Sequence, residues 1–232
     1  MRRIAVLIDG GFLLKRLPTV RPDVDPSDPA DVDKAIGQLV RNHLEEINKQ
    51  EGAPSPYALL YRCFFYDASP YAKRGHTPIG KKSIDYAKTP EAVFREGLFQ
   101  LLRRRSNFAV RLGIVERERA WIIKEQAQKA LIDRTRSVED LTDDDFTAGF
   151  RQKAVDMRLG LDIASISLKK QADTVILVTG DADFVPAAKL VRREGVRVVL
   201  DPLWQNVKPD LFEHIDVLRS GYPRPQPRKD RT

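Results

Sequence analysis

The sequence has few of the residues on which several common kinds of site depend. It contains one cysteine, Cys63, and three histidines that lie far apart in the chain. A single cysteine excludes a disulfide within the chain and a cysteine-rich zinc site, and it suits a reducing compartment. Because Cys63 lies in the apolar run 61–66, the sequence indicates a buried, unreactive thiol.

Long apolar stretches are also missing. The run Ile4–Ile8 follows two arginines but ends at Asp9, which makes it too short for the apolar part of an export signal. No stretch approaches the roughly 20 apolar residues that cross a bilayer. The sequence therefore predicts a cytoplasmic protein with no membrane partner.

The length of the chain indicates the size of its core, and its net charge indicates the kind of partner it could bind. The 232 residues are 42% hydrophobic, which is enough to bury the core of one α/β domain. The formal net charge is +7 and the pI is near 9.5. Such an excess favours an anionic partner such as nucleic acid, although basic proteins of other classes share it.

Strand-like and helix-like segments alternate along the chain. Apolar runs predict strands over 4–8, 57–66, 108–115, 174–179 and 196–200. Helices are expected over 12–17, 31–52, 90–102, 151–170 and 184–194. This alternation predicts an α/β fold, with a central, mainly parallel sheet flanked by helices.

One domain is expected to cover residues 1–218. Residues 18–29 and 67–89 are polar and are expected to be loops. The charged stretch of about 116–150 is expected to be an insertion, with a hairpin around Trp121. The basic, proline-rich segment 219–232 is expected to be a flexible tail.

Two of the predicted strands that look most strongly buried run into aspartate. The first is followed by Asp9, and the fourth leads through Thr179 to Asp181 and Asp183. If these strands are neighbours in a parallel sheet, their carboxyl ends meet at one edge, where the ligand crevice of such a sheet lies. Close carboxylates repel one another, and a hard divalent cation commonly holds them together. The residues therefore predict a Mg²⁺ or Mn²⁺ site that could activate water and neutralise a phosphoryl group.

The helix expected over 151–170 brings further candidates. Asp156 lies near its start, where a carboxylate would face the same crevice. Asp162 lies about 120° around the helix and about 9 Å further along, so it is better suited to support the site or to act as a buried polar partner. Lys153, one turn before Asp156, could contact a phosphate of the substrate or simply be solvated. Gly11 and Thr179 are expected to support the site or to lie against the substrate.

Each aspartate also has an ordinary structural interpretation. Asp9 could be a turn residue, and Asp183 could cap the helix that follows it. Asp156 could stabilise the helix through the helix dipole. Either strand-end signal alone is weak, and it is their combination that favours a functional site.

Four segments resemble the NYN (LabA-like) family of PIN-like nucleases. They are V-L-I-D-G-G-F at 6–12, Y-R-C-F-F-Y-D-A at 61–68, Q-K-A-V-D-M-R-L-G-L-D at 152–162 and V-T-G-D-A-D-F-V-P at 178–186. They occur in family order, and the resemblance spans roughly residues 3–218. It implies a PIN-like three-layer fold and cleavage of RNA that depends on Mg²⁺ or Mn²⁺. It also implies that Asp9, Asp156, Asp181 and Asp183 form the catalytic and metal-binding set.

Two positions depart from the family pattern. Gly11 stands where many members carry asparagine, and Ala154 stands where a glycine is frequent. Gly11 removes a contact to substrate or water, which leaves open an RNA-binding or adaptor domain with little turnover.

Other phosphotransfer enzymes are a further alternative. A phosphatase of the haloacid dehalogenase type would need a second aspartate at Gly11. A dinucleotide-binding domain is disfavoured because no G-x-G-x-x-G follows the first strand. The expected function is thus a metal-dependent endoribonuclease acting on single-stranded RNA, and a homodimer remains open.

Overall fold

The computed structural model describes residues 2–226, and these residues form two compact units. The first contains the chain up to Asp67, Gly97–Leu112 and the residues from Val155 onward. The second contains Ala68–Glu96 and Gly113–Ala154. Each unit therefore consists of segments that are separated in the sequence.

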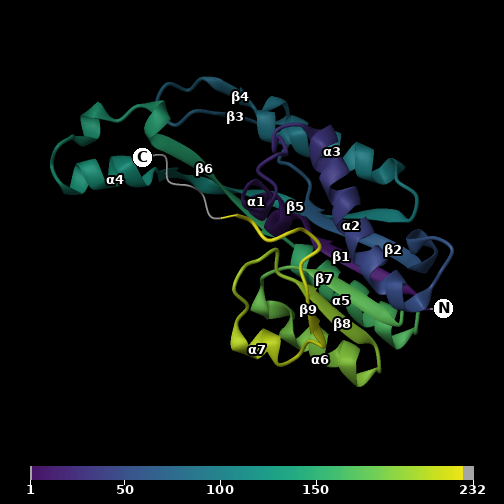
Figure 1. The fold of residues 1–232 in the computed structure, drawn as a ribbon. Helices are drawn as coiled ribbons and strands as arrows, with labels where there is room; N and C mark the ends of the chain where they lie inside the picture. The colour runs from purple at the N-terminus through teal and green to yellow at the C-terminus, as the bar shows by residue number, and fades with distance from the viewer. Residues whose placement is uncertain (1, 227–232) are drawn as a thin grey trace. The chain divides into compact units, whose positions relative to one another are not determined.

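A parallel sheet forms the centre of the first unit (Figure 1). Its parallel strands, in spatial order, are β2 (Leu60–Ala68), β1 (Ile4–Asp9), β7 (Thr174–Val178), β8 (Arg197–Asp201) and β9 (Val217–Leu218). Beside β2 lies β5 (Phe108–Ile123), whose later residues belong to the second unit. The predicted α/β fold with a mainly parallel sheet is confirmed.

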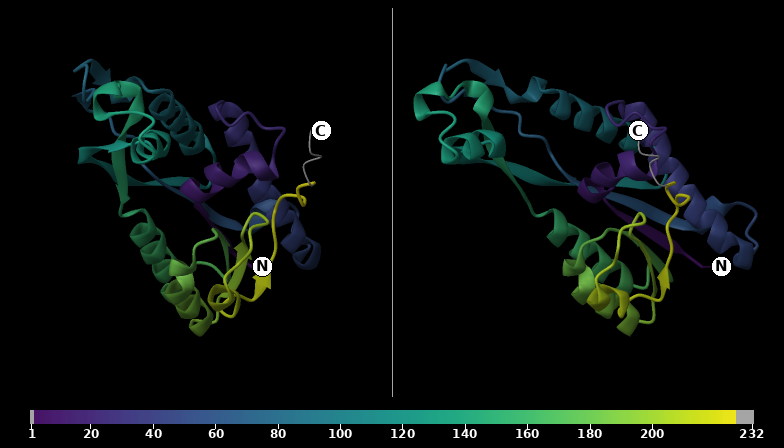
Figure 2. Two further views of the ribbon diagram at one scale, coloured as in Figure 1. Left: turned by 90° about the vertical axis from the view of Figure 1, so that its left-hand side faces the viewer. Right: turned by 60° about the vertical axis from the view of Figure 1, so that its left-hand side comes forward.

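Helices cover both faces of this sheet. The described helices of eight or more residues that lie at least partly in this unit are α1 (Gly10–Val20), α2 (Pro29–Glu51), α3 (Pro90–Arg104), α5 (Val155–Leu168) and α6 (Val185–Arg193). The chain moves from β1 to β2 in one direction along the sheet and from β7 to β8 in the other. Right-handed crossovers therefore place α2 and α6 on opposite faces, and Figure 2 shows this arrangement.

Burial explains the continuous apolar runs in the two central strands, β1 and β7. Ile4–Ile8 are completely buried, and Val175–Val178 are 1% exposed or less. A strand with covers on both faces has no solvent side, so a continuous apolar run replaces the usual alternation. Cys63 is also fully buried, and burial raises the pKa of its thiol, as expected for an unreactive cysteine.

Several segments differ from the sequence-based predictions. Helix α1 continues through Pro18 to Val20, whereas a loop was expected from residue 18. The stretch 67–89 contains a short antiparallel pair, β3 (Arg74–His76) with β4 (Ser83–Asp85). Residues 146–153, which include the expected start of a helix, form the strand β6 (Phe146–Lys153).

The second unit is built around an antiparallel pair. Strand β6 pairs with β5, so that Trp121 lies opposite Ala148 within the pair. Helix α4 (Glu125–Ile132) and short 3₁₀ turns connect the two strands. At the end of β6, Ala154 has φ +66°, a left-handed conformation that glycine adopts more easily, as the family pattern at this position would suggest.

The first residues of the expected flexible tail are packed against the rest of the first unit. Tyr222 is 2% exposed and its hydroxyl donates to the carbonyl oxygen of Ala35 over 2.7 Å. The amide of Gly221 donates to Oδ2 of Asp201, which also contacts His43 Nε2 at 2.8 Å. Residues 227–232 of the expected tail lie outside the described residues. No helix of the described chain is long and apolar enough to cross a membrane.

Candidate functional site

The carboxyl ends of β1 and β7 lie side by side in the middle of the sheet. From this point the chain continues to one side of the sheet after β1 and to the other side after β7. Ile8 pairs with Val178, so Asp9 and Thr179 emerge side by side. The chain leaves β1 toward β2 and leaves β7 toward β8, on the opposite side. In open parallel sheets, the crevice for a ligand lies at this reversal, outside the carboxyl ends of the strands.

Asp9 is held by two hydrogen bonds. Its Oδ1 accepts from the backbone amide of Phe12 at 3.0 Å, which makes Asp9 the N-cap of α1. Its Oδ2 accepts from the hydroxyl of Thr179 at 3.3 Å. Asp9 therefore caps a helix as well as lying at the strand end. Each carboxylate oxygen has a further lone pair that could bind a cation.

The turn after β7 is held by the same threonine. Thr179 is fully buried, and its hydroxyl accepts from the amide of Asp181 at 3.2 Å. Asp181 in turn caps a 3₁₀ turn, Ala182–Phe184, by accepting from the amide of Asp183 at 3.0 Å. The alternative in which Asp183 caps the next helix is wrong, since Phe184 is the N-cap of α6 and makes no side-chain cap bond.

Position 180 in this turn has no room for a side chain, because the Phe12 ring lies against it. A Cβ atom at Gly180 would come within 2.7 Å of Cε2 of the Phe12 ring. The Phe12 ring therefore packs directly against the turn that carries Asp181. This contact links the first turn of α1 to the loop after β7.

Electrostatic interactions connect Asp156 to both strand ends. Asp156 lies in the first turn of α5. Burial raises the pKa of Asp156, and the nearby carboxylates of Asp181 and Asp183 raise it further. Burial also raises the pKa of Asp9, against the lowering effect of its hydrogen bonds, and the carboxylates of Asp156 and Asp67 add to the rise. The charges that act on Asp9 and Asp156 are thus all negative.

Asp67 is the residue that the sequence interpretation did not include. Its side chain is completely buried, and it follows Tyr66, which pairs with Asp9 across β1 and β2. The signal was the same one that identified Asp9, an aspartate at the end of an apolar strand. It was overlooked because residues 67–89 were assigned to a polar loop.

Asp162 has different partners. Its Oδ2 accepts from the Tyr66 hydroxyl at 2.9 Å and pairs with Arg111 Nε at 3.2 Å. Burial and the adjacent Asp162 carboxylate both raise the pKa of Tyr66, which keeps the phenol protonated as the donor. Asp162 is not among the charges that shift Asp9 or Asp156. This is the arrangement of a partly buried polar partner.

The expected position of Lys153 is wrong. Lys153 lies in β6 of the second unit, not on the helix that carries Asp156, and its Nζ pairs with Glu116. Helical spacing therefore gives no reason to place it at a phosphate. Gly11 lies in the first turn of α1, where an added Cβ would be 3.6 Å from Asp9 Oδ1, an ordinary contact distance.

Asp9, Asp156, Asp181 and Asp183, which we call the acidic cluster, offer oxygen ligands that suit a hard divalent cation. Carboxylate oxygens are the ligands that Mg²⁺ and Mn²⁺ prefer, and a cation would neutralise the carboxylate charges whose burial and repulsion raise the two pKa values. Within residues 2–226, however, no three Asp, Glu, His or Cys side chains are arranged to hold one ion as they stand. Side-chain rearrangement would have to accompany binding.

Comparison with known proteins identifies the family. The family model of the NYN domain matches residues 82–205, more than half of the chain. The chain belongs to the NYN domain family. The match includes Asp156, Asp181 and Asp183 of the NYN domain, and it begins well after Asp9.

Other comparisons add little to this assignment. No curated protein matches the NYN domain described here. A crystal structure of a protein of unknown function from Vibrio parahaemolyticus RIMD 2210633 is similar, with 15% sequence identity and a TM-score of 0.44. The similarity covers 95% of each chain.

Proposed function

We propose that this NYN domain is an endoribonuclease that hydrolyses phosphodiester bonds of single-stranded RNA with the help of Mg²⁺ or Mn²⁺. The observation that carries the proposal is the meeting of carboxylates from β1, from the turn after β7 and from α5. Burial raises the pKa of two of them, Asp9 and Asp156, and neighbouring carboxylates raise it further. Such a cost is commonly maintained where a site needs its negative charge for a cation.

Asp9, Asp156, Asp181 and Asp183 are the residues that would hold the cation. When bound, a divalent ion supplies charge neutralisation at a phosphoryl group and activates water for in-line attack. Thr179 would act as a positioning residue, because its hydroxyl fixes both Asp9 and the amide of Asp181. Membership of the family supports the choice of RNA as the substrate.

The histidines offer no comparable base for this reaction. His43 is buried and hydrogen bonded to Asp201. His214 follows the short helix α7 (Pro209–Phe212), and its Nε2 lies 3.8 Å from Oδ1 of Asp210 on that helix. Neither these two nor His76, which lies in β3, is among the groups that shift the pKa of Asp9 or Asp156. The acidic cluster is therefore the best-supported place for the chemistry.

A second candidate is an RNA-binding or adaptor domain without turnover. One observation favours it: among the described residues, no three acidic side chains are placed so that they could hold one ion. It is opposed by the number of carboxylates at one sheet edge, which an adaptor would not need.

Cleavage of an end-labelled single-stranded RNA tests these alternatives. The purified chain is incubated with RNA in Mg²⁺, in Mn²⁺ and in EDTA, and with a phosphomonoester such as p-nitrophenyl phosphate. We expect internal cleavage of RNA with either ion and none in EDTA. RNA binding without cleavage would support the adaptor, and hydrolysis of the monoester alone would indicate another phosphotransfer enzyme.

A further inference from the structure

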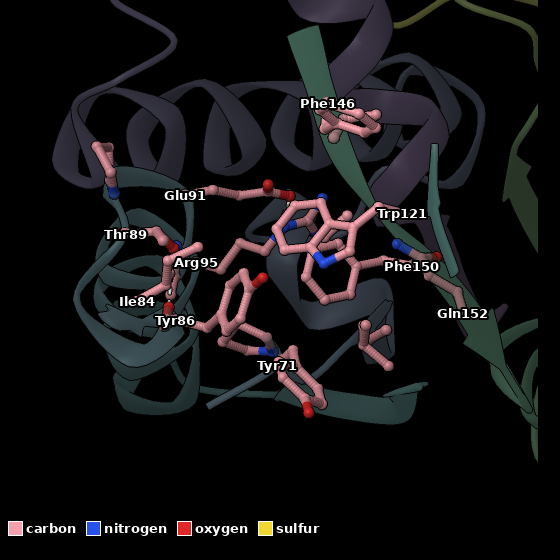
Figure 3. A pocket seen from close by; sticks show the side chains of 17 residues that line it. Tyr71, Ile84, Tyr86, Thr89, Glu91, Arg95, Trp121, Phe146, Phe150 and Gln152 are labelled. Atoms are coloured by element: carbon pink, nitrogen blue, oxygen red, sulfur yellow. Dashed lines mark hydrogen bonds and ion pairs between the residues drawn. The ribbon is translucent and has the colours of Figure 1, made fainter. Parts of the chain in front are cut away.

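The second unit contains a cavity of about 590 Å³, formed entirely by its own residues. Its volume is in the range of sites that bind small organic molecules. Aromatic side chains dominate its walls, and we call it the aromatic pocket: Tyr71, Tyr86, Trp121, Phe146 and Phe150. Figure 3 shows these side chains around the pocket. None of the proposed catalytic aspartates belongs to it.

One wall follows from the alternation along β6. Phe146, Ala148, Phe150 and Gln152 occupy every second position and all line the pocket. Side chains two residues apart in a strand share a face, so this face is apolar up to Gln152 at its end. Across the strand pair, Trp121 lies opposite Ala148 and completes the wall.

The other wall comes from the segment before α3. Tyr71 and Tyr86 contact each other edge to face, with ring centroids 5.3 Å apart. Both rings also contact Phe150, each at 5.4 Å. Phe150 is nevertheless 45% exposed, so one side of its ring remains open to a ligand.

Two polar atoms, one in the lining of this pocket and one behind it, are buried without a hydrogen-bond partner. They are the hydroxyl oxygen of Tyr86, a pocket residue that is only 7% exposed, and Nε of Arg117. The Arg117 guanidinium lies over the rings of Trp121, at 4.8 Å, and Tyr86, at 5.7 Å. Figure 3 shows the Tyr86 ring among the side chains that line the pocket. Unpaired buried polar atoms are rare in folded proteins, and a ligand that bonds to them would explain their presence.

The charge of the lining distinguishes between kinds of ligand. Among the described residues that line the pocket, the charged ones are Glu91 and Arg95, and they pair with each other at 3.1 Å. An anionic group such as a phosphate would find no excess positive charge among them. A neutral, planar group with polar edges fits better, because aromatic faces stack on it and the tyrosine hydroxyl bonds to its edge.

We propose that the aromatic pocket binds a nucleobase. The base stacks against the ring of Phe150 or Trp121 and its polar edge bonds to the hydroxyl of Tyr86. The base belongs either to a free nucleotide or to an unpaired position of an RNA chain, and the sugar and phosphate remain outside the pocket. This inference does not depend on cleavage, since no residue of the acidic cluster takes part.

Trp121 can report binding directly. The chain has two tryptophans, so Trp204→Phe leaves Trp121 as the single fluorophore. In this background and in EDTA, the protein is titrated with AMP, with UMP, with ribose 5-phosphate and with a short single-stranded oligoribonucleotide. We expect the nucleotides or the oligonucleotide to change Trp121 emission in a saturable way, and ribose 5-phosphate to leave it unchanged. Saturation by AMP or UMP indicates free nucleotide as the ligand, and a response to the oligonucleotide alone indicates RNA.

Two variants separate binding from folding. Tyr86→Phe removes only the unpaired hydroxyl, so stability in urea should be equal or higher, while the dissociation constant rises about fivefold. Phe150→Ala removes a stacking ring and should raise it at least about tenfold. The matched control is Phe212→Ala, since Phe212 is similarly exposed but lies on α7 of the first unit.

Three results would overturn the proposal. One is unchanged Trp121 emission with every nucleotide and oligonucleotide. The second is equal binding of ribose 5-phosphate, which would mean that phosphate and not the base is recognised. The third is an oligonucleotide affinity that neither Tyr86→Phe nor Phe150→Ala alters. Since all titrations are made in EDTA, loss of nuclease activity would not produce any of these results.

Discussion

Thr179 Oγ1 donates a hydrogen bond to Asp9 Oδ2 over 3.3 Å and thereby joins the ends of the two central strands of the sheet. The same hydroxyl accepts from the amide of Asp181. The buried Thr179 side chain thus holds both the carboxylate at the end of β1 and the turn after β7 that carries Asp181. A threonine or serine can do this because a hydroxyl donates and accepts at the same time.

Thr179→Val should therefore weaken cleavage while preserving the fold. The loss of a side chain that orients a metal ligand commonly costs about 10–100-fold in activity. The Thr179 hydrogen bond lowers the pKa of Asp9, so its removal raises that pKa and moves the acid limb of the pH–rate profile to higher pH. Thr179→Ser, which keeps the hydroxyl, is the control and should retain both rate and profile. An unchanged profile in Thr179→Val would contradict the role given to this residue.

Asp9→Asn should stabilise the protein when no cation is present. The folded-state pKa of Asp9 is raised above the ordinary value of 3.8, so the folded state holds its proton more tightly than the unfolded state. Stability falls as pH rises through this window, and the full loss persists above the folded pKa. Asparagine keeps the N-cap bond from Phe12 without the charge.

Urea denaturation in EDTA measures this difference. Asp9→Asn should be more stable than the wild type at pH 7.5, with the gap narrowing as the pH is lowered toward 3.8. Addition of Mn²⁺ should stabilise the wild type more than the variant, because only the wild type retains the full binding charge. A wild type that is the more stable protein in EDTA at pH 7.5 would contradict an unfavourable, buried charge at Asp9.

The neighbouring glycines of α1 should respond oppositely to alanine. A Cβ atom at Gly10 would lie 2.6 Å from both Cζ of Phe65 and the carbonyl oxygen of Tyr66, whereas at Gly11 it meets Asp9 Oδ1 at 3.6 Å. Gly10→Ala should cost about 2 kcal/mol by overpacking. Gly11→Ala should be neutral or stabilise by about 0.5 kcal/mol through helix propensity. Thermal unfolding compares the two, and equal effects would contradict the packing described at the start of α1.

Binding of RNA should depend strongly on salt. The chain carries +7 net charge, and no base-reading motif is evident among its dispersed basic residues. From about 50 to about 200 mM salt, affinity for single-stranded RNA in EDTA should fall at least about tenfold. Fluorescence anisotropy with a labelled oligonucleotide measures this, and a flat salt dependence would show that charge does not hold the RNA.

The sequence predicted those parts of the fold in which one physical signal dominates. Strands β1 and β7 are buried on both faces, so their apolar runs were unambiguous, and the parallel register then brought Asp9 next to Thr179. Asp67 also follows an apolar run, but it was missed because residues 67–89 were assigned to a polar loop, whereas β2 continues to Ala68.

The second unit was harder to predict for a physical reason. Strand β6 has one apolar face and one polar face, and the segment Phe146–Lys153 lies before a true helix, so its polar residues were assigned to that helix. Its partner strand β5 continues past residue 115, where charged residues replace the apolar pattern. Pairing across 22 intervening residues, 124–145, is a tertiary property that local composition does not reveal.

Cleavage of single-stranded RNA by Asp181→Asn tests the central claim most directly. Asparagine keeps the size of the side chain and can still cap the turn at Asp183, but it removes the charge that would hold the cation. The matched control is Asp173→Asn, because Asp173 precedes the amino end of the same strand β7 and bonds instead to the amide of Arg3.

All three proteins are assayed in Mn²⁺ and in EDTA, with RNA binding measured in parallel. The account predicts cleavage by the wild type and by Asp173→Asn in Mn²⁺ only, and none by Asp181→Asn, which still binds RNA. Equal cleavage by Asp181→Asn and the wild type, or cleavage that persists in EDTA, would show that the acidic cluster is not the catalyst.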